Sequence, residues 1–152
     1  MGGGTSISVS LWGRFQAIFR GSKWPSSGRG SLADLDSYLD RLIRSPERQG
    51  TLVVQVLDSP AFIQFTGGAS GVEMDFPLVT VDQKAREPRI RGFCDRHHLK
   101  VRVSFGTNRA SFLDVDLPPD PRATAAIARL AFAEIFDVRD PVEVEYLGDG
   151  LA

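Results

Sequence analysis

The order of its predicted elements constrains this chain more than any motif does. Between residues 31 and 138 the hydrophobic periodicity changes in the order helix, three strands, helix, two strands, helix. Short links between the three consecutive strands favour an antiparallel meander, because parallel strands need long crossover connections. The sequence therefore predicts an α+β fold of the order α-β-β-β-α-β-β-α, in which an antiparallel sheet packs against helices.

Local start signals define the first and last helices. Ser31 is a favourable N-cap, and Asp34 three residues later resembles a capping box. Leucines then recur at helical spacing, which predicts a helix over 31–45. Asp120 followed by proline is a second helix start, and a broad apolar stripe predicts a final helix over 120–138.

The predicted strands are rich in β-branched and aromatic residues or alternate between apolar and polar side chains. Pro77 is expected to end the third of them. Residues 141–146 also alternate, which predicts a short edge strand or an ordered tail. The five strands predicted within the domain cover 51–57, 61–66, 72–76, 99–105 and 109–117.

The domain organisation follows from composition. The chain has 152 residues, enough for one domain with a core of its own. We expect an N-terminal extension over 1–30, which combines an amphipathic segment with a linker-like Pro, Ser and Gly stretch, then one α+β domain over 31–138. An acidic tail is expected over 139–152.

Charge and cysteine content narrow the partners and the compartment. The formal net charge of -1 predicts no general attraction to nucleic acid or membranes, and one cysteine excludes an intrachain disulfide framework. No secretory signal is expected, so a cytoplasmic protein is the prediction. The segment 11–20 is apolar along one helical face and is predicted to pack on the domain or on a second copy. Contact of this segment with a membrane surface is a less favoured alternative.

Cys94 and His97 are the first candidates for chemistry. They lie three residues apart in a short predicted helix after Pro88, so they share a helical face. Such a pair would suit a thiolate nucleophile or two ligands of a metal ion. Both residues also continue the apolar stripe of Ile90 and Phe93, which favours a structural role. A small thiol enzyme or metal protein remains an alternative function.

Two pairs of acidic residues lie at strand spacing. Glu73 and Asp75 are two residues apart, as are Asp114 and Asp116, so each pair points to one side of its strand. Paired carboxylates can bind divalent cations or transfer protons. The default interpretation is the solvated face of an amphipathic strand.

A basic pair, Lys100 and Arg102, shares one face of the fourth strand. Phosphates or an acidic partner would suit it. No aromatic residue lies between them on that face to stack on bases, so an acidic protein partner, or the acidic tail of this chain, is preferred over nucleic acid.

A family resemblance adds to this interpretation. It is carried by Phe62-Ile63-Gln64-Phe65 in the second strand and by the final helix from Asp120, which closes on Glu134-Ile135-Phe136-Asp137-Val138. With the element order, these segments resemble the fold of type III secretion chaperones, and within it the TY-Chap group of bacterial chaperone-like proteins. The resemblance implies a small non-enzymatic protein, often a homodimer, that binds extended segments of another chain.

The sequence thus predicts a chaperone-like protein-binding module without enzymatic activity or cofactor. An immunity or antitoxin-like protein, which also binds one partner, is an alternative. Apolar residues of the strands are proposed as part of the binding surface, although each of them is more often found in the core of its own domain. The residues proposed to contact the partner are Phe62, Phe65, Met74, Phe76, Lys100 and Arg102.

Overall fold

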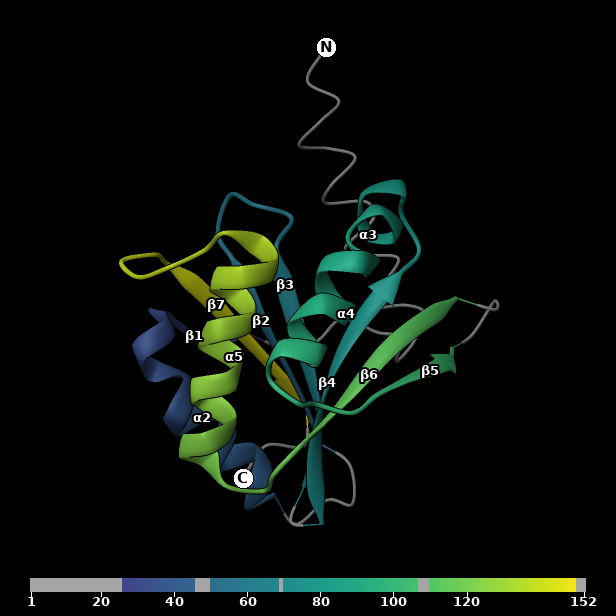
Figure 1. Ribbon diagram of the computed structural model, residues 1–152. Coiled ribbons are helices and arrows are strands. Elements are labelled where there is room, and N and C mark those ends of the chain that lie inside the picture. Colours follow the sequence, from purple (N-terminus) through teal and green to yellow (C-terminus); the bar gives the residue numbers. More distant parts are fainter. Residues whose placement is uncertain (1–25, 46–49, 69, 107–109, 150–152) are drawn as a thin grey trace.

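A seven-stranded antiparallel sheet forms the centre of the protein, and the helices cover one of its faces (Figure 1). The computed structural model describes residues 26–45, 50–68, 70–106 and 110–149. The strand order across the sheet is β1-β7-β2-β3-β4-β6-β5. The strands are β1 (Ser26–Gly30), β2 (Gly50–Val56), β3 (Phe62–Gly68), β4 (Gly71–Leu78), β5 (Val101–Phe105), β6 (Ser111–Leu117) and β7 (Val144–Asp149). The α+β prediction is therefore confirmed, including the meander β2-β3-β4 and the hairpin β5-β6.

The helices begin where the sequence predicts. Ser31 caps the first turn by accepting from the Ala33 amide, and the carboxylate of Asp34 accepts from the Ser31 amide in return. Asp120 caps the last helix by accepting from the Arg122 amide. The helical elements are the 3-10 turn η1 (Leu32–Asp34) and the helices α2 (Leu35–Ile43), α3 (Val81–Ala85), α4 (Glu87–Arg96) and α5 (Pro121–Phe136).

The third strand is longer than predicted. Pro77 was expected to end it, but β4 continues to Leu78. The β3–β4 pairing stops at Asp75, so Pro77 faces only β6, where it pairs with Phe112. A proline is tolerated there because the strand has a neighbour on one side only, and the missing N–H breaks no ladder hydrogen bond toward β3.

The first and last described strands pair with each other at one side of the sheet. The predicted linker contains β1, which pairs with β7 through Arg29 and Glu145. The tail strand was predicted at an edge, but β7 lies between β1 and β2. The sheet thus extends beyond the domain boundaries 31–138 on both sides, because the pairing of these strands joins residues that are distant in the sequence.

The main core lies between the sheet and the helices. α5 contacts both α2 and α4, so the helices form one layer (Figure 1). Tyr146 of β7 stacks on Tyr38 of α2, with ring centroids 3.8 Å apart, and its hydroxyl donates to the Ser31 carbonyl. Phe132 of α5 is fully buried in the same core. These contacts fix β7 and the helix layer to each other.

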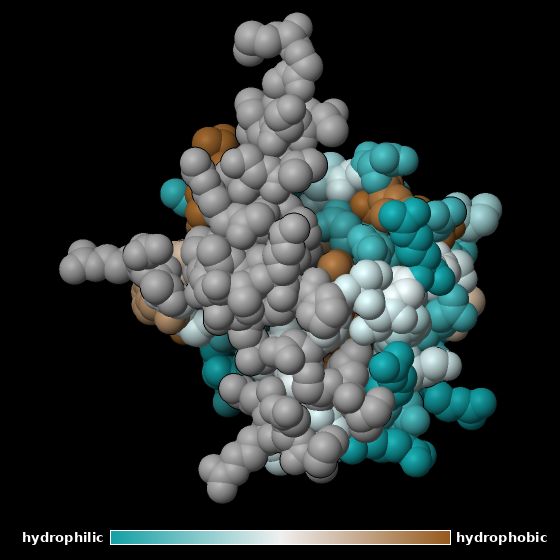
Figure 2. All heavy atoms as spheres, turned by 180° about the vertical axis from the view of Figure 1, so that it is seen from behind, coloured by the Kyte–Doolittle hydropathy of each residue, from teal (hydrophilic) through white to brown (hydrophobic). Residues whose placement is uncertain are grey.

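The opposite face of the sheet, called the back face below, combines apolar and polar side chains. A small apolar cluster on it consists of Val53, Phe62, Phe112 and Leu147, all of which are buried. In the view from behind, hydrophobic colour on the described residues gathers in small separate areas (Figure 2). The polar side chains of β3, β4 and β6 share this face, since they alternate with the core residues.

Within the described residues, no helix is both long enough and apolar enough to cross a membrane.

Candidate functional site

The structure places most of the predicted apolar partner residues in the core. Phe65, Met74 and Phe76 point toward the helices, and the Phe76 ring lies 6.5 Å from that of Phe136 in α5. Phe62 points to the back face, because it lies three residues before Phe65 on the same strand. The four side chains are buried and do not form one accessible platform.

The two residues of the predicted basic pair, Lys100 and Arg102, have different surroundings in the structure. Lys100 is exposed just before β5. Arg102 lies on the back face, where its Nη2 is 2.7 Å from Glu73 Oε2 and 2.7 Å from Asp116 Oδ1. Both side chains are exposed, but the charge of Arg102 is already paired with carboxylates of this chain. Of the two, Lys100 is therefore the better candidate for contact with an acidic partner.

The outer edge of the sheet at β5 presents apolar side chains. Among the described residues, no strand pairs with the edge of β5 that faces away from β6. Val103 and Phe105 lie two residues apart on one side of this strand and are 51% and 74% exposed. The helix layer stops short of β5, which leaves that side uncovered by helices (Figure 1). We call the outer backbone edge of β5 with these two side chains the β5 edge.

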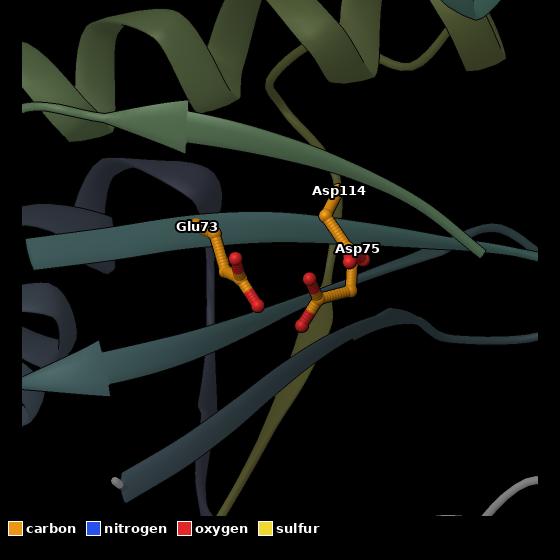
Figure 3. A group of neighbouring side chains, drawn as sticks. All are labelled: Glu73, Asp75 and Asp114. Atoms are coloured by element: carbon orange, nitrogen blue, oxygen red, sulfur yellow. The ribbon is translucent and has the colours of Figure 1, made fainter. Parts of the chain in front are cut away.

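Carboxylates from two neighbouring strands meet on the back face. The register pairs Glu73 of β4 with Asp116 of β6, and Asp75 with Asp114. Glu73, Asp75 and Asp114 point to the same side of the sheet, and the carboxyl groups of Asp75 and Asp114 lie next to each other (Figure 3). We call Glu73, Asp75, Asp114 and Asp116 the carboxylate cluster. The two pairs predicted from strand spacing are thus parts of one group.

Asp75 is at the buried centre of this cluster. It is 4% exposed, and Asp114 is 5% exposed. Asp75 Oδ2 accepts a hydrogen bond from the Thr66 hydroxyl, and Gln64 Nε2 lies 3.4 Å from it. Within the described part of the chain, Asp75 Oδ1 and Gln64 Oε1 are buried and have no hydrogen-bond partner. Two buried oxygens with no donor are costly, so the site favours a proton or a cation at this place.

The pKa of Asp75 also indicates that the cluster favours a proton or a cation. Burial, proximity to Asp114 and the charge of Glu73 raise the pKa of Asp75 well above its usual range, and the Thr66 hydrogen bond opposes them. Asp75 and Asp114 can share a hydrogen bond only when one of them carries a proton, because two carboxylates have no donor between them. The cluster can therefore hold a proton or bind a positive ion.

The contacts of Cys94 and His97 are those of residues with a structural role. Cys94 is buried, and burial raises the pKa of its thiol, which is the opposite of what an activated thiolate needs. The His97 ring packs at a tilt against that of Phe93, with 4.6 Å between ring centroids, and its Nε2 lies 2.8 Å from Glu134 Oε2. Hydrogen bonds from His97 and Arg96 lower the pKa of Glu134. This contact joins the end of α4 to α5, in line with the structural interpretation.

Four residues of the candidate site were not singled out from the sequence. Gln64 and Thr66 were assigned only to a strand, although a single Gln between Ile63 and Phe65 was a signal of a polar position in an apolar strand. Val103 and Phe105 were predicted to alternate within a strand, but their exposure depends on that strand being outermost.

Comparison with known proteins produced no match: no family model, no curated protein and no solved structure is similar to the chain by the criteria applied. The resemblance to secretion chaperones stays a prediction that rests on the element order and the two segments quoted for it.

Proposed function

We propose that this protein is a non-enzymatic, chaperone-like protein-binding module of the cytoplasm, and that it binds an extended segment of another polypeptide along the β5 edge. The observation that carries the proposal is the exposure of Val103 and Phe105 on an outermost strand. Outer strands are normally protected by charges, by proline or by a covering element, because an open edge accepts other strands. Two exposed apolar side chains on such an edge are the opposite of this protection.

The mode of binding follows from strand geometry. A partner segment added beside β5 would form backbone hydrogen bonds with its outer N–H and C=O groups. Alternate side chains of that segment would lie beside Val103 and Phe105, so apolar residues at every second position are expected in the partner. Lys100, exposed just before β5, favours an acidic residue in the segment beside its end of the strand.

Dimerisation needs a different surface in this proposal. The homodimer implied by the resemblance would have to form away from β5, since an edge paired with a second copy is not available to a partner. A chaperone client and an immunity-type target would use the edge in the same way, so the identity of the partner separates these two roles.

The test is selection from a random peptide display library with the full chain as bait. The variant Val103→Lys places a charge on the β5 edge. Val81→Lys is the matched control, because Val81 is an exposed valine of α3 outside the edge. Support would be enriched peptides with alternating apolar residues that bind wild type and Val81→Lys but not Val103→Lys. Enrichment that Val103→Lys leaves intact, or none with folded wild type, would refute the proposal.

A further inference from the structure

We infer that Glu73, Asp75 and Asp114 bind a hard divalent cation on the back face of the sheet, and that calcium is the ion that suits this irregular set of oxygens. This site is separate from the β5 edge and does not depend on the proposed function. It rests on the geometry of the carboxylate cluster, on a buried amide beside it, and on the finding that no described basic residue forms an ion pair with Asp75 or Asp114.

The spacing of the oxygens is the first argument. One carboxylate oxygen of each of the three residues lies within 4.8 Å of the other two. Ligands at 2.3–2.6 Å from calcium lie at most about 4.6–5.2 Å apart, so three oxygens within this limit can contact one calcium ion. Calcium is preferred over magnesium because it accepts irregular sets of protein oxygens, whereas magnesium demands near-ideal octahedral geometry and usually keeps several waters.

Gln64 is an independent observation that points to a ligand. It is 2% exposed, it pairs directly with Asp75 across β3 and β4, and its Oε1 has no partner in the described part of the protein. Its amide nitrogen lies 3.4 Å from Asp75 Oδ2, so the amide group faces the cluster. Rotation of the Gln64 amide by half a turn would exchange its two atoms and place Oε1 beside the cluster, where Nε2 lies now. Adjacent ligands of calcium are about 3.3–3.7 Å apart, and calcium accepts amide oxygens.

The charges of the cluster are not balanced at its centre. Arg102 is paired with Glu73 and Asp116, which lie on the more exposed side. Among the described residues, no Lys, Arg or His forms an ion pair with Asp75 or Asp114. A buried carboxylate needs a counter-charge or a proton. A divalent cation would supply the charge and would also occupy the unpartnered Asp75 Oδ1.

A proton is the competitor of the cation. Asp75 is faced by Glu73 on its own strand, Gln64 and Thr66 on β3, Asp114 and Asp116 on β6, and Arg102 on β5. Burial and the neighbouring Asp114 and Glu73 favour the protonated form of Asp75, whereas the cation requires the ionised form. Affinity for calcium is therefore expected to rise with pH through the range in which Asp75 loses its proton.

The experiment is isothermal titration of the full chain with calcium chloride after treatment with EDTA, at about pH 7.5 and about pH 5. Wild type should bind one ion, more tightly at the higher pH and more tightly than magnesium. Asp75→Asn should weaken binding about 10-fold or more, since even changes next to metal ligands cost 10–100-fold. Asp40→Asn, which removes an exposed carboxylate of α2, should leave the affinity unchanged.

Two results would overturn the inference. Folded wild type that binds no calcium at about 1 mM, the weak end of calcium sites, would show that the cluster holds a proton instead. Equal affinity in wild type and Asp75→Asn would assign the binding to scattered surface carboxylates. If Asp75→Asn does not fold, as judged by circular dichroism, Asp114→Asn gives the same comparison at the neighbouring ligand.

Discussion

The burial of Asp75 predicts that the metal-free protein loses stability as the pH rises. Its pKa in the folded state is raised, so the native carboxyl keeps its proton above the pH of about 3.9 at which an unfolded aspartate releases it. Between these two pKa values the native state binds more protons than the unfolded state. The free energy of unfolding then falls by up to about 1.36 kcal/mol per pH unit, until Asp75 ionises in the folded state as well.

Asp75→Asn isolates this contribution. The amide has nearly the same shape and no charge, so the variant should lack the negative slope that Asp75 provides. The other titratable groups are common to both proteins and cancel in the difference. We expect the variant to gain stability relative to wild type as the pH rises from about 4, with a difference approaching about 1.36 kcal/mol for each pH unit.

The assay is urea unfolding of both proteins in EDTA at several pH values. A difference in unfolding free energy that stays constant across the range would refute the reasoning, because it would mean that Asp75 titrates normally when folded. Asp114→Asn tests the cause of the shift. Burial is the largest cause, ahead of the contact with Asp114, so this variant should keep most of the slope.

Three further outcomes follow from burial, capping and reactivity. Phe65→Ala should cost about 3–5 kcal/mol because it leaves a cavity under the helices, whereas Phe105→Ala should be nearly neutral in urea unfolding; similar costs would show that one of the two side chains is misplaced. Asp120→Ala should remove the cap of α5 and cost about 1 kcal/mol, measured by thermal unfolding, with the exposed Asp82→Ala as a comparison. Cys94 should react with a thiol reagent only in denaturant, and rapid labelling of the native protein would contradict its burial.

Elements with strong local signals were predictable from the sequence. The caps at Ser31 and Asp120 and the apolar periodicities depend only on residues a few positions apart, so the order of the helices and of strands β2 to β6 was found. β1 was missed because four of the five residues of Ser26–Gly30 are glycine or serine and the segment has no apolar alternation. Its strand conformation comes from pairing with β7, which is distant in the sequence.

The candidate site was predictable in parts. The sequence placed Glu73 on the same face as Asp75, and Asp114 on the same face as Asp116, because residues two positions apart share a face in any strand. The opposition of Asp75 and Asp114 depends on β4 and β6 being neighbours, although two helices and β5 separate them in the sequence. The apolar candidates Phe65 and Met74 looked equally suited to a platform and to a core, because the sequence does not say which face the helices cover.

The position of β7 has a consequence for synthesis of the chain. A ribosome makes every other described strand and helix before it makes β7, yet β7 fills the gap between β1 and β2. Until then one edge of β2 has no partner and β1 has no described strand to pair with. An open apolar strand edge in a nascent chain is prone to wrong associations. The sheet can therefore be completed only after β7 has been made, and until then this edge of β2 is open to other strands.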